Sequence, residues 1–181
     1  YASHIPGATA TLIGVTLGIY GLTQALLQLP FGALSDHFGR KPIIMTGLVL
    51  FFAGSLVAAF SHSIYTLMLG RALQGAGAIG STTLAFVSDL THDEHRSKAM
   101  AMMGLTIGFS FAIAIIIGPI INAWFHLSGI FLFTAVLGCL GIALVALVPS
   151  PPRLSRHTRS SARPPLTQIL KNTQLLRLDI G

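Results

Sequence analysis

Two groups of polar residues interrupt a sequence that is otherwise strongly apolar. The first is the string GALSDHFGRKP, in which Asp36 and Arg40 lie four positions apart. The second is LMLGRALQGAGA, in which Arg71 and Gln74 are flanked on both sides by apolar sequence. An arginine at the centre of a lipid-facing helix costs about 2.5–3.5 kcal/mol on insertion scales, so Arg71 is expected to face a cavity or a partner. The alternative is that Arg71 extends to the outer interface, because it lies about seven residues, roughly 10 Å, from the start of its helix.

The segment around Asp36 has the composition of a tight, charged turn between two helices. Gly39 permits the bend, and Pro42 suits the first turn of the next helix, where a backbone N–H is not needed. The carboxylate of Asp36 and the guanidinium of Arg40 are spaced to meet at this turn. As a turn alone, the pattern says little about function.

Composition places both groups in a membrane protein. Hydrophobic residues make up 52% of the chain, charged residues make up 9%, and the mean hydropathy is +0.76, which is too apolar for a water-soluble domain. The net charge of +6 could suggest nucleic acid, but the basic residues form no stripe with interleaved aromatic residues, so we expect no nucleic-acid partner. The one cysteine, Cys139, excludes a disulfide framework. The sequence shows no nucleophile paired with a base, no metal-ligand set and no phosphate-binding loop, so we expect no enzyme activity and no metal.

Five apolar stretches are long enough to cross a bilayer as helices, at residues 9–34, 43–60, 64–88, 99–122 and 127–148. Each stretch is continuously apolar rather than alternating, which disfavours the strands of a barrel. We therefore predict an all-α integral membrane fold with a transmembrane bundle over residues 1–149. Residues 150–181 are rich in proline and arginine and are expected to form a cytoplasmic linker with a short amphipathic helix.

Small and polar residues recur four positions apart within the apolar stretches. Rows of small residues let helix backbones approach closely in lipid, so we expect close packing at Gly14 and Gly18, Gly77 and Ser81, and Gly104 and Gly108. Gln24 and Gln28 either line a polar cavity or bond to a neighbouring helix, and they are the candidates for substrate binding.

The distribution of Lys and Arg predicts the orientation in the membrane. Ten of the eleven basic residues follow the first, third or fifth stretch, and the alternate connections at 1–8, 61–63 and 123–126 contain none. The positive-inside rule makes the basic side cytoplasmic. The first stretch then runs from outside to inside, so a complete protein is expected to carry one more helix upstream. The chain opens on Tyr1, and both ends resemble cuts in a longer protein.

The two polar strings resemble the motifs of a known family. GALSDHFGRKP is similar to the signature between the second and third helices of the major facilitator superfamily, and LMLGRALQGAGA is similar to the fourth-helix motif of its drug/proton antiporter branch. Arg71 follows Asp36 by 35 residues, which places both strings on the appropriate helices. The resemblance implies a multi-pass protein of the bacterial inner membrane with twelve helices in two halves and a substrate site near the midplane. The helices present here would be numbers two to six, with the first helix and the C-terminal half missing.

The resemblance also implies roles for individual residues. The signature residues would be Gly32, Asp36, Gly39, Arg40 and Lys41. Asp36 and Arg40 would form a gating charge cluster with Asp89 that locks the two halves together in the outward-facing state. Arg71, with Gln74 and Gly75, would couple transport to protons by shifting the protonation of a nearby carboxylate, so the proton gradient would be the driving force and no cofactor is expected.

A third segment resembles the antiporter motif of the fifth helix. The residues that match it are Gly104, Gly108, Gly118 and Pro119. Ala114 stands where the pattern usually has glycine, and Asn122 stands near its closing glycines. These departures weaken the prediction of export relative to import.

The leading hypothesis is a secondary transporter that exports a small, amphipathic or drug-like molecule in exchange for protons. One alternative is a uniporter or symporter for a polar metabolite such as a sugar. Another is a membrane protein that does not transport, either a truncated remnant or an interaction subunit. Substituting Arg71→Ala would abolish transport under the first hypothesis and would change only assembly, or nothing, under the last.

Overall fold

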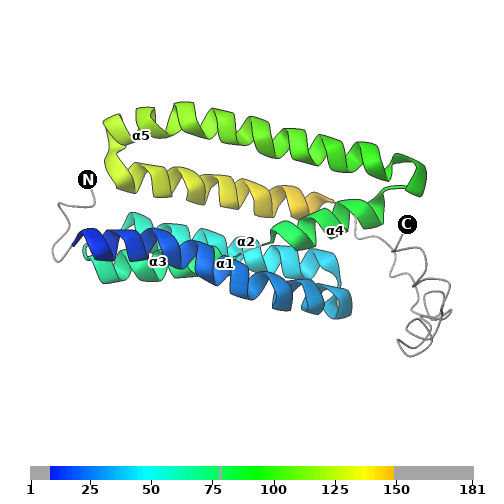
Figure 1. Cartoon of the computed structure of the whole chain (residues 1–181), viewed down its shortest axis with the longest axis horizontal. Helices are drawn as coiled ribbons and strands as arrows, with labels where there is room; N and C mark the ends of the chain where they lie inside the picture. Colours follow the sequence, from blue (N-terminus) through cyan, green and yellow to red (C-terminus); the bar gives the residue numbers. More distant parts are fainter. Residues whose placement is uncertain (1–8, 78, 149–181) are drawn as a thin grey trace, which may run out of the picture. The chain divides into compact units, whose positions relative to one another are not determined.

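The computed structural model describes residues 9–77 and 79–148, and this part of the chain is helical (Figure 1). Its elements are α1 (Ala10–Phe38), α2 (Arg40–Ala59), α3 (Ile64–Ala76), α4 (Gly80–Leu90), the 3-10 turn η2 (Asp93–His95) and α5 (Arg96–Leu147). All of them belong to the first of the two compact units into which the chain divides, Tyr1–Pro151. The linker and amphipathic helix predicted over 150–181 lie outside the described residues.

The first two helices meet at a turn of one residue. α1 begins after Thr9, whose side chain accepts a hydrogen bond from the Leu12 N–H at 3.2 Å, and it ends at Phe38. Gly39 has φ 98° and ψ 153°, a backbone conformation that side chains strongly disfavour, so glycine is required there. α2 begins at once, with Pro42 in its first turn as predicted. The polar residues around the turn are themselves helical. α1 therefore ends four residues after the stretch 9–34, and α2 begins three residues before the stretch 43–60.

The third apolar stretch forms two helices, so the prediction of one continuous helix over 64–88 is wrong. α3 ends at Ala76, and the Gly77 N–H caps it by donating to the carbonyls of Leu73 and Gln74. A Cβ on Gly77 would meet the backbone of α2 at Gly47 and Phe51, so this position packs too closely for any side chain. Glycine is a weak helix former, and three glycines between 75 and 80 permit the break.

The fourth and fifth stretches form the two arms of a helical hairpin, both within α5. His126 separates the arms with a non-helical backbone of φ 59° and ψ −165°. The first arm, residues 96–125, and the second arm, residues 127–147, run in opposite directions (Figure 1). The chain therefore reverses direction within the connection that was predicted at 123–126.

Three helical stretches of the described residues are long and apolar enough to cross a membrane. They are Ala10–Phe38, Arg40–Ala59 and Asp93–Leu147, the last of which contains both arms of the hairpin. α3 has 13 residues and α4 has 11, so each is too short to cross alone.

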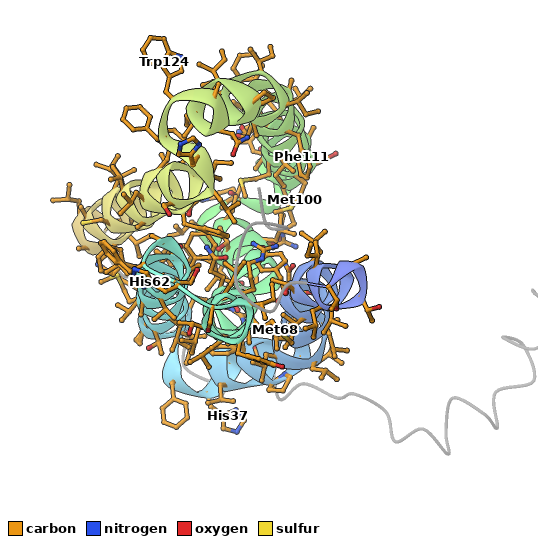
Figure 2. All side chains as sticks on the ribbon, turned by 90° about the vertical axis from the view of Figure 1, so that its left-hand side faces the viewer. His37, His62, Met68, Met100, Phe111 and Trp124 are labelled. Atoms are coloured by element: carbon orange, nitrogen blue, oxygen red, sulfur yellow. The ribbon has the colours of Figure 1, made fainter. Side chains whose placement is uncertain are left out.

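The helices differ in how far they pack against one another. α2 lies against α3 and against α5, and α1 lies mainly against α3. A buried apolar cluster joins the ends of α2 and α3 to the second arm, with Ala58, Ala59, Ile64, Leu67 and Phe131. The first arm carries mostly exposed side chains, and Trp124 near its end points away from the other helices (Figure 2).

Candidate functional site

Asp36, Arg40 and Asp89, here called the charge cluster, lie together at one end of the bundle. The Arg40 Nη1 atom lies 2.6 Å from Asp36 Oδ1, and its Nε atom lies 3.0 Å from Asp89 Oδ2. Arg40 Nη1 also donates to the buried Ser35 hydroxyl at 2.6 Å. The arginine side chain is 18% exposed, whereas Asp36 is 60% exposed. The cluster therefore joins α1, α2 and α4 through one largely covered guanidinium.

The other signature residues have separate contacts. Lys41 Nζ donates to the carbonyls of Ala146, at 2.9 Å, and Val148 at the end of the second arm. A cation at the C-terminus of a helix interacts favourably with the unpaired carbonyls and with the helix dipole. Gly32 faces α4, where a Cβ would lie 4.0 Å from Ser81 Oγ. His37, which follows Asp36, points away from the bundle (Figure 2). The signature segment thus joins four helices at one end.

Arg71, Gln74, Ser55 and Tyr20, here called the polar cluster, lie within the apolar packing. Arg71 Nη1 donates to Gln74 Oε1 at 3.0 Å, and Gln74 Nε2 donates to Ser55 Oγ at 2.8 Å. The guanidinium carbon lies 4.4 Å from the centroid of the Tyr20 ring, a distance typical of a cation–π contact. The cluster therefore places one cation among side chains of three helices, and Arg71 faces partner side chains, one of the two surroundings expected for it.

Gly75 explains why α1 reaches the polar cluster. A Cβ at this position would meet the carbonyl oxygen of Tyr20 and the hydroxyl of Thr23, so α1 lies directly on the backbone of α3. This contact fixes the position of the Tyr20 backbone. Gly75 lies one helical turn after Arg71 in α3, so the Tyr20 side chain starts close to the guanidinium. Gly75 thus allows α1 to pack against α3, and its neighbour Gln74 makes the hydrogen bonds to Arg71 and Ser55.

Two cavities border the polar cluster. One, of about 220 Å³, has apolar walls from α1, α3 and the second arm, with Arg71 on its surface. The other, of about 270 Å³, is lined by Tyr20, Gln24 and Gln74 together with apolar residues and the break between α3 and α4. Gln24 thus lines a cavity, but this cavity is mostly apolar rather than the polar cavity of the first predicted alternative. Gln28 lies beside α4, where its backbone carbonyl, not its side-chain amide, accepts from Ser81 Oγ at 3.4 Å.

The antiporter-like residues are not part of either cluster. A Cβ on Gly104, Gly108 or Gly118 would meet nothing within 4 Å, and Pro119 is exposed. The same holds for Gly14 and Gly18, so the expected close packing at these positions does not occur among the described residues. Of the predicted rows, Gly77 lies in close contact with α2, and Ser81 contacts α1 through its hydroxyl.

Three contacts at these clusters were not predicted from the sequence: the ring of Tyr20, the hydroxyl of Ser55 and the cap formed by Lys41. The hydroxyl of Ser55 is fully buried in α2. A lone serine or tyrosine inside an apolar helix is a weak signal, because such a residue can also bond to its own helix.

A helical bundle with a charged turn and a half-buried cation fits a membrane transporter. The profile of the Major Facilitator Superfamily matches residues 1–178, and the chain belongs to this family. Members of this family are transporters rather than enzymes, as the sequence predicted.

Three relatives place the chain more closely. It is 45% identical to the inner membrane transport protein YajR of Escherichia coli K12, over 100% of this chain and 40% of that protein. It is 43% identical to an uncharacterized transporter of Buchnera aphidicola from Acyrthosiphon pisum, over 80% of this chain and 37% of that protein. It is 34% identical to the class B tetracycline resistance protein of Escherichia coli, over 64% of this chain and 28% of that protein. The chain is an inner-membrane protein and spans less than half the length of these relatives.

Proposed function

We propose that this chain forms part of a proton-coupled exporter that moves small, amphipathic or drug-like molecules across the inner membrane by alternating access. The observation that carries the proposal is Arg71, a cation held inside an apolar bundle by Tyr20 and Gln74. Ionisable residues at such positions are costly and usually functional. The remaining helices, the rest of the substrate pocket and the C-terminal half would come from the same protein beyond this chain.

Arg71 can couple a conformational change to protons through electrostatics. A guanidinium favours the ionised form of any carboxyl group brought near it and therefore promotes loss of that group's proton. When the carboxyl group moves away, it regains its proton more readily. Alternating access that changes this separation would bind protons on one side of the membrane and release them on the other.

The charge cluster is suited to act as a gate. Ion pairs whose carboxylates reach solvent contribute only about 0–1 kcal/mol each, so the links from Arg40 to the exposed Asp36 and Asp89 can be broken and remade during a conformational cycle. Because Arg40 contacts both α1 and α4, release of either carboxylate would loosen this end of the bundle. We propose that the cluster is closed in the outward-facing state.

The substrate proposal rests on the cavities and on two relatives. Class B and class C tetracycline resistance proteins are 34% and 32% identical to this chain. Gln24 and Tyr20 offer hydrogen-bonding groups in a cavity that is otherwise mostly apolar, which suits an amphipathic molecule. Tetracycline and ethidium are therefore the first probes to use.

The test uses everted membrane vesicles that contain the protein expressed with its natural flanking sequence. Respiration should drive uptake of a probe, and an uncoupler should abolish that uptake. Arg71→Ala should lower the rate at least about tenfold at an unchanged protein level, because the cation of the coupling step is removed. Arg96→Ala is the matched control, since Arg96 pairs with Asp93 at the exposed end of α5 and lies in neither cluster.

Each result separates one hypothesis from the others. Uptake by Arg71→Ala at the wild-type rate would overturn the role of Arg71. Transport of a probe that ignores the uncoupler would favour a uniporter. A wild-type protein that moves neither probe would overturn the drug-like substrate class.

A further inference from the structure

We infer that Ser55 and Tyr20 are positioning residues for Arg71, with Ser55 acting through the side-chain amide of Gln74. The inference rests on the proposed role of Arg71 in proton coupling and extends it to two residues on other helices. Neither residue belongs to the motifs that identified the site. The argument follows the hydrogen bonds from α2 through α3 to the guanidinium.

The Ser55 hydroxyl has a defined direction. It donates its one proton to the Phe51 carbonyl, one turn earlier in α2, at 2.7 Å. Its lone pairs are therefore the groups that face Gln74, and they accept the Gln74 Nε2 proton at 2.8 Å. Ser55 is 0% exposed and Gln74 is 2% exposed, so water does not compete for this hydrogen bond.

This bond sets the orientation of the Gln74 amide. With Nε2 on the side of Ser55, the carbonyl oxygen Oε1 faces α3 and accepts from Arg71 Nη1 at 3.0 Å. The reverse orientation would place an NH₂ group against a guanidinium, and both groups only donate hydrogen bonds. Ser55 and Arg71 therefore favour the same orientation, and the bond to Ser55 holds the Gln74 amide where it presents an acceptor to Arg71.

The backbones of α2 and α3 are close enough to make this link direct. A Cβ on Gly54 would lie 2.5 Å from the Gln74 backbone nitrogen and 2.7 Å from the Gly70 carbonyl oxygen. No side chain can separate the helices at this level. The short hydroxyl of Ser55 consequently reaches Gln74 without an intervening water.

Tyr20 holds the guanidinium by a different interaction. Its ring centroid lies 4.4 Å from the guanidinium carbon, so ring and cation attract each other. The backbone of Tyr20 lies against Gly75, which fixes the position from which the ring extends. The amide of Gln74 and the ring of Tyr20 together hold Arg71 in place for the approach of a carboxyl group.

The first test is a double-mutant cycle on proton-driven uptake of tetracycline into everted vesicles. Ser55→Ala frees the Gln74 amide to turn, and loss of one hydrogen bond of this kind should lower the rate about five- to tenfold and shift its pH profile. Gln74→Met should do the same. The double variant should match Gln74→Met alone, because Ser55 acts only through the amide.

Matched controls separate positioning from folding. Ser61→Ala removes a hydroxyl that donates only to the Ala58 carbonyl, at 2.8 Å, just beyond the end of α2, and should leave the rate unchanged. Tyr20→Leu removes the aromatic ring and should lower the rate about two- to fivefold, as expected for loss of a cation–π contact that is exposed or half-buried. Equal rates for Ser55→Ala and wild type, or additive losses in the double variant, would overturn the inference.

The second test does not depend on transport. The Nε–Hε nuclear magnetic resonance signal of Arg71, assigned by its absence in Arg71→Lys, should shift and exchange faster with solvent in Ser55→Ala and in Tyr20→Leu. It should be unchanged in Ser61→Ala. A shifted signal in a protein whose wild type moves no probe would contradict the proposed function and leave the positioning intact. An unchanged signal in Ser55→Ala would contradict the positioning, whatever the transport result.

Discussion

Glycines have opposite surroundings in two regions of this bundle. Between α2 and α3, a Cβ on Gly70 would lie 2.6 Å from the Ala58 nitrogen, and one on Gly54 would lie 2.5 Å from the Gln74 nitrogen. On the first arm of α5, Gly104 and Gly108 have nothing within 4 Å. The same residue type is thus compulsory for packing in one region and leaves open space in the other. Spacing alone does not distinguish the two cases.

The polar cluster lies in the region where glycine is compulsory. Helices in lipid associate through van der Waals packing and interhelical hydrogen bonds rather than through the hydrophobic effect. Close backbones at Gly54 and Gly70 bring Ser55 within reach of Gln74, and the contact at Gly75 brings Tyr20 beside Arg71. The close packing of the helices therefore also orients the guanidinium of Arg71. Substitutions in the closely packed region and on the first arm should have different effects on stability.

The largest effect is expected at the contact between α2 and α3. Gly70→Ala adds a methyl group against the Ala58 backbone, and the two helices must move apart to accept it. We expect a loss of about 1–3 kcal/mol in the free energy of unfolding, the usual cost of overpacking. Unfolding in mixed detergent micelles, followed by circular dichroism, measures it. Wild-type stability would mean that the helices are not in contact at this level.

A smaller effect is expected where the second arm is attached to α2. Lys41→Met removes the ammonium group that donates to the Ala146 and Val148 carbonyls, while keeping the length of the side chain. Loss of this cap should destabilise the end of the second arm by about 0.5–1 kcal/mol. Hydrogen exchange should become faster at residues 144–148 and stay the same in the first arm. Equal changes in both arms would contradict the assigned contact.

The two carboxylates of the charge cluster should contribute unequally to the stability of the bundle. Asp89→Asn breaks a link between α2 and α4, whereas Asp36→Asn breaks a pair within four residues whose carboxylate is mostly exposed. We expect a loss of up to about 1 kcal/mol for Asp89→Asn and less than about 0.5 kcal/mol for Asp36→Asn. Thermal unfolding at low and high salt compares them. A larger loss for Asp36→Asn would place the main link elsewhere.

The smallest effect is expected on the first arm of α5. Gly104→Ala meets no neighbouring atom, and alanine favours a helix over glycine by about 0.5–1 kcal/mol. Stability should therefore stay the same or rise slightly, opposite in sign to Gly70→Ala. The same detergent unfolding measures both. A loss as large as that of Gly70→Ala would show that another segment packs on this arm.

Much of the fold could be predicted because long apolar stretches have few structural alternatives in a membrane. The helices, the turn at Gly39 and the reversal at residues 123–126 follow from length, composition and the positions of polar residues. The break between α3 and α4 was missed, because Gly77 and its neighbours occur in a window that is apolar throughout. Hydropathy alone does not predict a helix break at a glycine that is required by close packing against a neighbouring helix.

The candidate site could be predicted only in part. Arg71 and Gln74 stand out in the sequence because they are polar within an apolar stretch. Ser55 and Tyr20 could not be assigned, since their partners lie on other helices and depend on how each helix is rotated about its axis. A helix that is apolar on all sides carries little information about that rotation. The roles proposed for the clusters remain predictions.

The most direct test of the account compares two modes of transport in Arg71→Gln. Proteoliposomes containing the complete protein would be assayed for tetracycline uptake driven by a proton gradient, and for exchange of tetracycline without any gradient. The account predicts that the variant loses gradient-driven uptake and retains exchange. Arg71 is needed to couple proton movement to transport, whereas exchange requires only that the protein alternate between its two conformations. Retention of gradient-driven uptake at the wild-type rate would contradict the central role of Arg71.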